Sequence, residues 1–316
     1  MSFDFDALQK RLNGVSMEEV TKFAESKASS ESTYEDEDTG FWRPTFDKQG
    51  NAQAVIRLLP PLEGETPWVE YQDWFFKGPS GKYYVEKSLN TFNWEADPAA
   101  EWLSAQYDNH QGKGKPPLVA KYNVYRRYQH VVNVLVLNDV QNPDNNGQVF
   151  KYRFTAKGLM TMILESMKET YPGEAVINPF HPVDGANLVL NLYHKTDGDR
   201  SYPQYDKCRF ENPSPLFGGD MEKIGEVMAQ VQSIGYLVDR DNYKTYDQLA
   251  ARFNMVMGIQ PGASLTEAAA PSVGAEKASP LEDTTSEVEY DAGDDGDDGD
   301  ADDAMAAFRR AAAEMD

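Results

Sequence analysis

Aromatic rings and guanidinium groups are concentrated in one nine-residue stretch, YNVYRRYQH, at residues 122–130. In an extended strand, alternate side chains share a face, so each face of this stretch would carry both tyrosine and arginine. One face holds Tyr122, Arg126 and Tyr128, and the other holds Tyr125 and Arg127. Rings stack on unpaired bases and guanidinium groups bind phosphates, so the pattern is typical of a surface for single-stranded nucleic acid. A solvated edge strand whose tyrosines pack sideways explains it equally well.

A second cationic and aromatic stretch, QVFKYRF, spans residues 148–154. As a strand it places Lys151 and Arg153 on one face and three aromatic residues on the other. We expect the aromatic face to be at least partly core, and the two cations to contact phosphates.

A third such stretch, RSYPQYDKCRF, spans residues 200–210 and interleaves Tyr202 and Tyr205 with cations that include Arg209. Pro203 predicts a loop or an edge strand, because proline donates no ladder hydrogen bond. Three clusters together favour a groove for single-stranded nucleic acid over a protein-binding face, although tyrosine and arginine are also enriched at protein interfaces.

The formal net charge of -22 is unevenly distributed along the chain. Residues 265–316 hold 16 acidic against 3 basic residues, and residues 1–40 hold 10 against 4. Residues 41–264 therefore hold 26 acidic and 23 basic residues and are nearly neutral. The acidity belongs to the two ends, so it does not argue against a nucleic-acid groove in the middle.

The sequence lacks the common catalytic signatures: no phosphate-binding glycine loop, HExxH or GxSxG is present. The 4 histidines are scattered, and a single cysteine, Cys208, excludes an internal disulfide and any zinc site with several cysteines. No secretory signal and no apolar run of about 20 residues is visible, which predicts a soluble, intracellular protein. We expect no enzymatic activity, no cofactor and no metal.

Residues 41–258 are expected to form the folded core. Several short strands, interrupted by turns and one long helix, predict a barrel or partly open β-structure with added helices. The expected strands are 52–59, 68–76, 82–86, 131–137, 148–154 and 186–194. The expected helices are 155–171, 220–233 and 246–257, the last with a Thr245–Gln248 cap.

The two ends have a different character. Residues 1–40 predict two short helices, at about 5–12 and 16–26, followed by a linker at 29–39. Residues 259–316 are rich in Ala, Pro, Ser, Gly and Asp, which predicts a disordered acidic tail.

The core also resembles the helix-destabilising single-stranded DNA-binding proteins of T-even-like bacteriophages. The resemblance rests on an ordered set of segments: GNAQAVIRLLP (50–60), GKYYVEK (81–87), VNVLVLND (132–139), GQVFKYRF (147–154), GANLVLNL (185–192) and YDKCRF (205–210). It implies an OB-fold core that binds single-stranded DNA and an N-terminal segment for contacts between neighbours on the DNA. It also implies an acidic tail that recruits replication, recombination and repair proteins, and hence a location in the cytoplasm of the infected bacterium.

The resemblance assigns the DNA cleft to particular residues of this chain. They are Arg57, Tyr84, Arg126, Arg127, Tyr152, Arg153, Tyr202 and Tyr205. The local pattern adds Tyr122, Tyr125, Tyr128, Lys151 and Arg209.

Two features depart from the T-even pattern. Those proteins hold a structural zinc through three cysteines and a histidine, but the corresponding segment here, VEKSLNTFNWEADPAAEW, contains neither residue type. Ser88, Pro98 and Glu101 fall near the cysteine positions and Trp74 near the histidine, so we expect an apolar cluster of Phe92, Trp94 and Trp102 to replace the metal. The N-terminal arm, SFDFD, is also not basic, which puts cooperative assembly through it in doubt.

These observations predict a non-enzymatic, sequence-independent single-stranded DNA-binding protein. The alternative is an acidic interaction scaffold or nucleic-acid mimic whose tyrosines bind protein.

Overall fold

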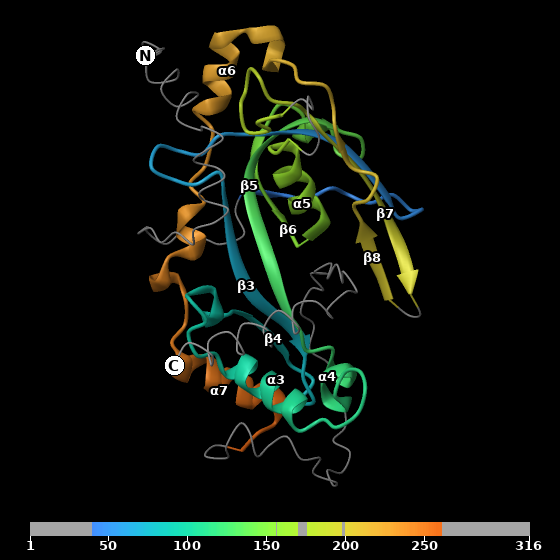
Figure 1. The fold of residues 1–316 in the computed structure, drawn as a ribbon, viewed down its shortest axis with the longest axis vertical. Helices are drawn as coiled ribbons and strands as arrows, with labels where there is room; N and C mark the ends of the chain where they lie inside the picture. Colours follow the sequence, from blue (N-terminus) through green and yellow to red (C-terminus); the bar gives the residue numbers. More distant parts are fainter. Residues whose placement is uncertain (1–39, 156, 170–175, 198–199, 261–316) are drawn as a thin grey trace.

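The computed structural model describes residues 40–155, 157–169, 176–197 and 200–260 (Figure 1). Its strands are β1 (Phe41–Trp42), β2 (Asn51–Leu58), β3 (Trp68–Lys77), β4 (Tyr83–Lys87), β5 (Arg126–Asp139), β6 (Val149–Phe154), β7 (Leu188–Asp197), β8 (Arg200–Gln204) and β9 (Arg209–Phe210). Its α-helices are α3 (Pro98–Asp108), α4 (Pro117–Tyr122), α5 (Lys157–Ser166), α6 (Met221–Met228) and α7 (Tyr246–Met257). The predicted N-terminal helices and linker, and the tail beyond residue 260, lie outside the described residues.

Short 3-10 helices connect several of these elements. They are η1 (Leu89–Thr91), η2 (Pro143–Asn145), η3 (Leu216–Gly219), η4 (Gly235–Val238) and η5 (Arg240–Asn242). No helix in the described part of the chain is both long and apolar enough to cross a membrane.

The long strand β5 organises the sheet. The described strands join in one sheet along the path β1-β6-β5-β2-β7-β8, with β3, β4 and β9 off this path. β2 and β3 pair antiparallel with successive parts of β5, at residues 134–139 and 126–132 respectively. β5 therefore links an upper region around α5 and α6 to a lower region around α3 and α7 (Figure 1). The mainly β structure with added helices is confirmed, and the OB-fold assignment stays a prediction.

Both faces of β5 are covered, as the apolar run at 131–137 predicts. Val132, Val134 and Val136 join the core that contains the α5 residue Ile163, so we call this side the α5 face. Leu135 on the other side joins a cluster with residues of α6, and we call that side the α6 face. At the lower end of the sheet a third cluster closes around Trp74, Tyr84, Trp102, Val119 and Phe253.

Most predicted elements are confirmed, with boundary differences. The predicted hairpin at 131–154 is present with η2 in its turn. α7 occupies the predicted range 246–257, with the Thr245–Gln248 capping box and a left-handed Gly258 at its end. α6 ends at Met228 rather than Ser233, and α3 and α4 were not predicted.

The nine-residue stretch at 122–130 is not one strand, so the prediction that its residues alternate from Tyr122 onward is wrong. Tyr122 is the last residue of α4, and Asn123 follows in a left-handed conformation with φ 50°. β5 begins only at Arg126. Apolar residues of α4, including Val119 and Tyr122, pack against the lower cluster. This packing favours a helix at Tyr122, where the local pattern predicts a strand.

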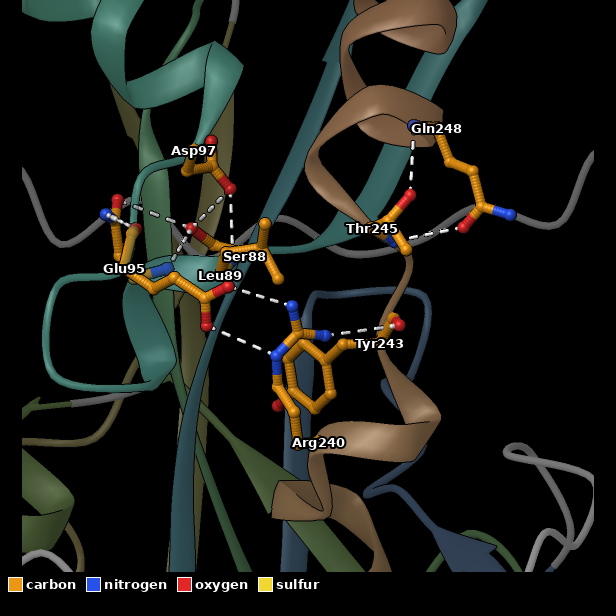
Figure 2. A network of polar contacts seen from close by, with 9 residues as sticks. Ser88, Leu89, Glu95, Asp97, Arg240, Tyr243, Thr245 and Gln248 are labelled. Atoms are coloured by element: carbon orange, nitrogen blue, oxygen red, sulfur yellow. Dashed lines mark hydrogen bonds and ion pairs between the residues drawn. The ribbon is translucent and has the colours of Figure 1, made fainter.

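The carboxylate of Asp97 joins η1, with its N-cap residue Ser88, to the start of α3 (Figure 2). Its Oδ2 accepts hydrogen bonds from the Ser88 hydroxyl at 2.9 Å and the Leu89 amide at 3.0 Å. Its Oδ1 accepts from the Ala99 and Ala100 amides, both at 3.0 Å, and so caps α3. Asp97 is only 1% exposed, and a carboxylate buried so completely requires such donors.

The segment for which the family resemblance implies a zinc does not fit a metal here. Both Asp97 oxygens already accept protein donors, and Glu101 accepts the Tyr246 hydroxyl at 2.6 Å. Within the ranges that the structure describes, no group of three or more His, Cys, Asp or Glu side chains is arranged to hold a metal ion.

The predicted cluster of Phe92, Trp94 and Trp102 does not form. Trp102 joins the lower cluster, Phe92 packs with Tyr243 in a separate cluster, and Trp94 is exposed. The segment is closed by hydrogen bonds to Asp97 and by two separate apolar contacts.

Asp97→Ala should destabilise the protein by about 2–4 kcal/mol, because it removes a helix cap and leaves buried donors unsatisfied. Urea unfolding of the full chain measures this loss. Asp220→Ala, which removes an exposed cap on α6, is the matched control and should cost less.

Purified wild-type protein should contain no stoichiometric zinc and keep its unfolding midpoint in chelator. An unfolding midpoint that falls in chelator would contradict the claim that Asp97, and not a metal, holds this segment. An Asp97→Ala variant as stable as wild type would contradict it too.

Candidate nucleic-acid interface

The two adjacent arginines of β5 point to opposite faces of the sheet and have different partners. Arg127 lies on the α6 face and is 8% exposed. Its Nε and Nη2 donate to the two Asp73 oxygens, both at 2.8 Å, and Gln129 donates to the same carboxylate at 3.0 Å. Asp73 lies directly opposite Arg127 in the β3–β5 ladder, so the register itself creates this pair. The charge of Arg127 is therefore neutralised inside the protein.

Arg126 lies on the α5 face, directly opposite Trp74 in the β3–β5 ladder, and is half-buried. Its Nη1 donates to Asn90 Oδ1 at 2.9 Å and its Nη2 to the Tyr128 hydroxyl at 3.1 Å. Its guanidinium lies 4.8 Å from the Trp94 ring centroid and 5.5 Å from that of Tyr128. Among the described residues no carboxylate forms an ion pair with Arg126. The side chain is held in place by neutral groups and keeps its positive charge.

His130 and Glu70 continue this face of β5 and β3 toward the upper core. The His130 ring stacks on Phe154 with centroids 5.4 Å apart and planes at 15°. Its Nε2 lies 3.6 Å from the Glu70 carboxylate, which is directly opposite in the ladder. Along this face of β5, the cation Arg126 with its neighbouring rings is followed four residues later by the His130–Glu70 pair.

Lys151 and Arg153 lie on the α6 face, the side of the sheet opposite Arg126. Lys151 is 5% exposed, and its Nζ donates to the Tyr236 hydroxyl at 2.8 Å and lies 4.8 Å from the Phe41 ring centroid. Arg153 donates to the Tyr71 hydroxyl at 3.2 Å and also lies over Phe41. Aromatic side chains thus cover both cations in this structure.

Three other predicted residues are buried. Arg57 is 0% exposed and donates to the carbonyls of His181 (3.0 Å), Pro182 (3.3 Å) and Ser214 (2.9 Å). Burial lowers its pKa to about 10, so it stays protonated at neutral pH as a link between loops. Tyr84 and Tyr152 lie in the lower cluster and the α5 core, where burial raises the pKa of each phenol.

The remaining predicted residues are distributed over two regions. Tyr122 and Tyr125 are half-buried at the lower end of the sheet, and Tyr205 packs against the α5 core. Tyr202 is half-buried on the edge strand β8, and Arg209 is exposed on β9. The edge position of Pro203 is confirmed, because β8 ends the strand path.

Of the predicted residues, the structure brings Arg126 and Tyr128 into direct contact on an accessible face. It adds Asn90 and Trp94, which the sequence analysis did not place in the site. The sequence signal for Trp94 is a large ring between polar neighbours, Asn93 and Glu95. Nothing in the sequence spacing connects Asn90 with Arg126.

Comparison with known proteins identifies related sequences. Residues 50–257 match the family described as "gp32 DNA binding protein like". The single-stranded DNA-binding protein of Enterobacteria phage T4 is 29% identical over 248 residues, which cover 77% of this chain and 79% of that protein. The protein of the same name from Enterobacteria phage T2 is 29% identical over 246 residues, covering 76% and 78%. That of Escherichia phage SV14 is 33% identical over 79 residues, covering 24% and 69%.

Arg127→Ala should cost about 3–5 kcal/mol of folding stability, because it leaves the Asp73 carboxylate buried without its cation. Arg126→Ala is the matched control at the neighbouring position and should unfold at nearly the wild-type denaturant concentration. Chemical unfolding of both variants tests the difference. Equal losses of folding stability in the two variants would contradict the assignment of Arg127 to a buried face and Arg126 to an accessible one.

Proposed function

This chain belongs to the gp32 DNA binding protein like family, and on that premise we propose that it is a non-enzymatic, sequence-independent single-stranded DNA-binding protein. The relatives carry the name single-stranded DNA-binding protein, and the match spans 50–257, nearly the whole described region. The proposal concerns this region first, because the site residues lie in it.

The observation that carries the proposal is the position of Arg126 beside two rings, those of Trp94 and Tyr128. A guanidinium held against Trp94 and Tyr128 without a bonded carboxylate suits a phosphate backbone, because its charge remains available. Rings beside it suit unpaired bases, and base stacking is worth about 1–3 kcal/mol per base without sequence preference. Both contacts are independent of base identity, which fits a protein that covers single strands of any sequence.

The wider role follows the family. We propose that the protein coats and protects single-stranded DNA during phage replication, recombination and repair, in the cytoplasm of the infected bacterium. Residues 1–40 would contact the neighbouring copy on the DNA, and the acidic tail at 259–316 would recruit replication and recombination proteins. No further component is needed for DNA binding itself.

Titration of a fluorescently labelled oligonucleotide at several salt concentrations tests the proposal. Arg126→Ala should weaken binding to all sequences alike and make the salt slope shallower by about 0.7, the value for one phosphate on a single strand. Lys48→Ala removes one exposed charge in the turn between β1 and β2 and is the matched control, with no change in slope expected. An unchanged slope in Arg126→Ala would remove this arginine from the interface. A chain that binds no oligonucleotide even without its tail would favour the acidic scaffold instead.

Deleting residues 265–316 should tighten DNA binding at low salt, with the advantage shrinking as salt rises. The segment carries 16 acidic and 3 basic residues, and tethering gives it a high effective concentration near the cationic site. Its repulsion of phosphates is screened over about 10 Å at 0.1 M salt. Full-length and truncated proteins are compared on one oligonucleotide across a salt series. Equal affinities throughout would show that the tail does not compete with DNA.

A further inference from the structure

Trp94 differs from the other tryptophans of the protein in its exposure. The chain contains 5 tryptophans, and all lie within the described residues. Four are core residues with at most 4% exposure: Trp42, Trp68, Trp74 and Trp102. Trp94 is 41% exposed and lies outside every apolar cluster of the described fold. Trp94 is therefore not a core residue of the described fold, and part of its ring is accessible to a ligand.

The backbone at Trp94 adopts a conformation that L-residues avoid. Asn93 and Trp94 have φ values of 51° and 61°, in the left-handed region. A bulky aromatic residue rarely adopts this strained conformation, which persists only where surrounding contacts impose it. Such strain is concentrated at functional sites.

The surrounding contacts that impose this conformation are present. The Trp94 amide donates to the Asn90 carbonyl at 3.3 Å, and the Glu95 amide donates to the Phe92 carbonyl at 2.9 Å. The Asn90 side chain donates to the Glu95 carbonyl at 2.9 Å. Phe92 packs edge-on against Tyr243 at 4.6 Å between centroids. The loop is therefore fixed on both sides of the tryptophan.

The nearest acidic side chain in the loop is occupied elsewhere. Glu95 accepts hydrogen bonds from Arg240 at 2.8 Å and 3.2 Å (Figure 2). The guanidinium of Arg126 lies beside the Trp94 ring, 4.8 Å from its centroid. An exposed ring beside a cation whose charge is not cancelled attracts an anionic ligand that also has a flat face.

We propose that Trp94 is a base-stacking residue of the DNA site, held out of the core by the loop at 88–97 and placed beside Arg126. The proposal rests on the proposed function and adds to it a residue that neither the sequence pattern nor the family resemblance assigned. An unpaired nucleobase stacks on the indole ring while Arg126 contacts its phosphate, which combines the two modes of single-strand binding in adjacent side chains. A protein partner lacks the phosphate that would engage Arg126.

Tryptophan fluorescence gives a direct test because Trp94 is the one exposed indole. Tryptophan fluorescence is excited at wavelengths that tyrosine does not absorb, and iodide is used as the collisional quencher. Iodide should quench only the Trp94 component, and a saturating unlabelled oligonucleotide should both quench that component and protect it from iodide. Trp94→Phe keeps a smaller ring, so it should lose the DNA-dependent tryptophan change and still bind a labelled oligonucleotide, measured by anisotropy, more tightly than Trp94→Leu.

Trp94→Leu keeps an apolar side chain without the ring, and should bind roughly five- to 150-fold more weakly, the fold-change for one lost base stack. Its unfolding midpoint should match that of Trp94→Phe, which separates stacking from folding. The inference fails if wild-type protein binds the labelled oligonucleotide while Trp94 stays equally open to iodide, or if the Leu and Phe variants bind alike. Absence of any oligonucleotide binding by wild type would instead overturn the proposed function.

Discussion

The buried carboxylate of Asp97 is the interaction on which the candidate site depends. It accepts four hydrogen bonds, two from η1 and its N-cap Ser88 and two from the first turn of α3, and a carboxylate 1% exposed would be costly to bury without them. These bonds fix both ends of the loop at 88–97. The fixed loop in turn presents Asn90 to the guanidinium of Arg126 and the Trp94 ring to its face. A single carboxylate thus joins η1 to α3 and holds the loop between them.

The second constraint is the pairing of β3 with β5, which gives two neighbouring arginines different roles. The register places Asp73 opposite Arg127 and Trp74 opposite Arg126. Arg127 therefore meets a carboxylate on the α6 face, whereas Arg126 meets rings and an amide on the α5 face. The first arrangement stabilises the sheet and the second leaves a charge available. Neither arrangement follows from composition, because both residues are arginine and both lie in the same strand.

Most of the regular elements could be predicted from the sequence, but α3, α4 and the arrangement of the site could not. The apolar run at 131–137 predicted a buried central strand, and the Thr245–Gln248 box predicted the start of α7, because these signals are local. Arg57 was predicted from the resemblance to bind DNA, yet the structure buries it against three carbonyls contributed by residues more than 120 positions away. Asn90 and Trp94 were not predicted, since their link to Arg126 spans more than 30 residues and depends on the loop conformation that Asp97 imposes. A pattern search finds residues of the right type, but the pairing of distant segments decides which of them are accessible.

A double-mutant cycle between Asn90 and Arg126 tests the central claim, that the loop acts on DNA by positioning this arginine. Affinity for one oligonucleotide is measured for wild type, Asn90→Ala, Arg126→Ala and the double variant. If Asn90 acts through Arg126, its substitution weakens binding in the wild-type background and has little further effect once Arg126 is gone. Losses that simply add in the double variant would contradict the account.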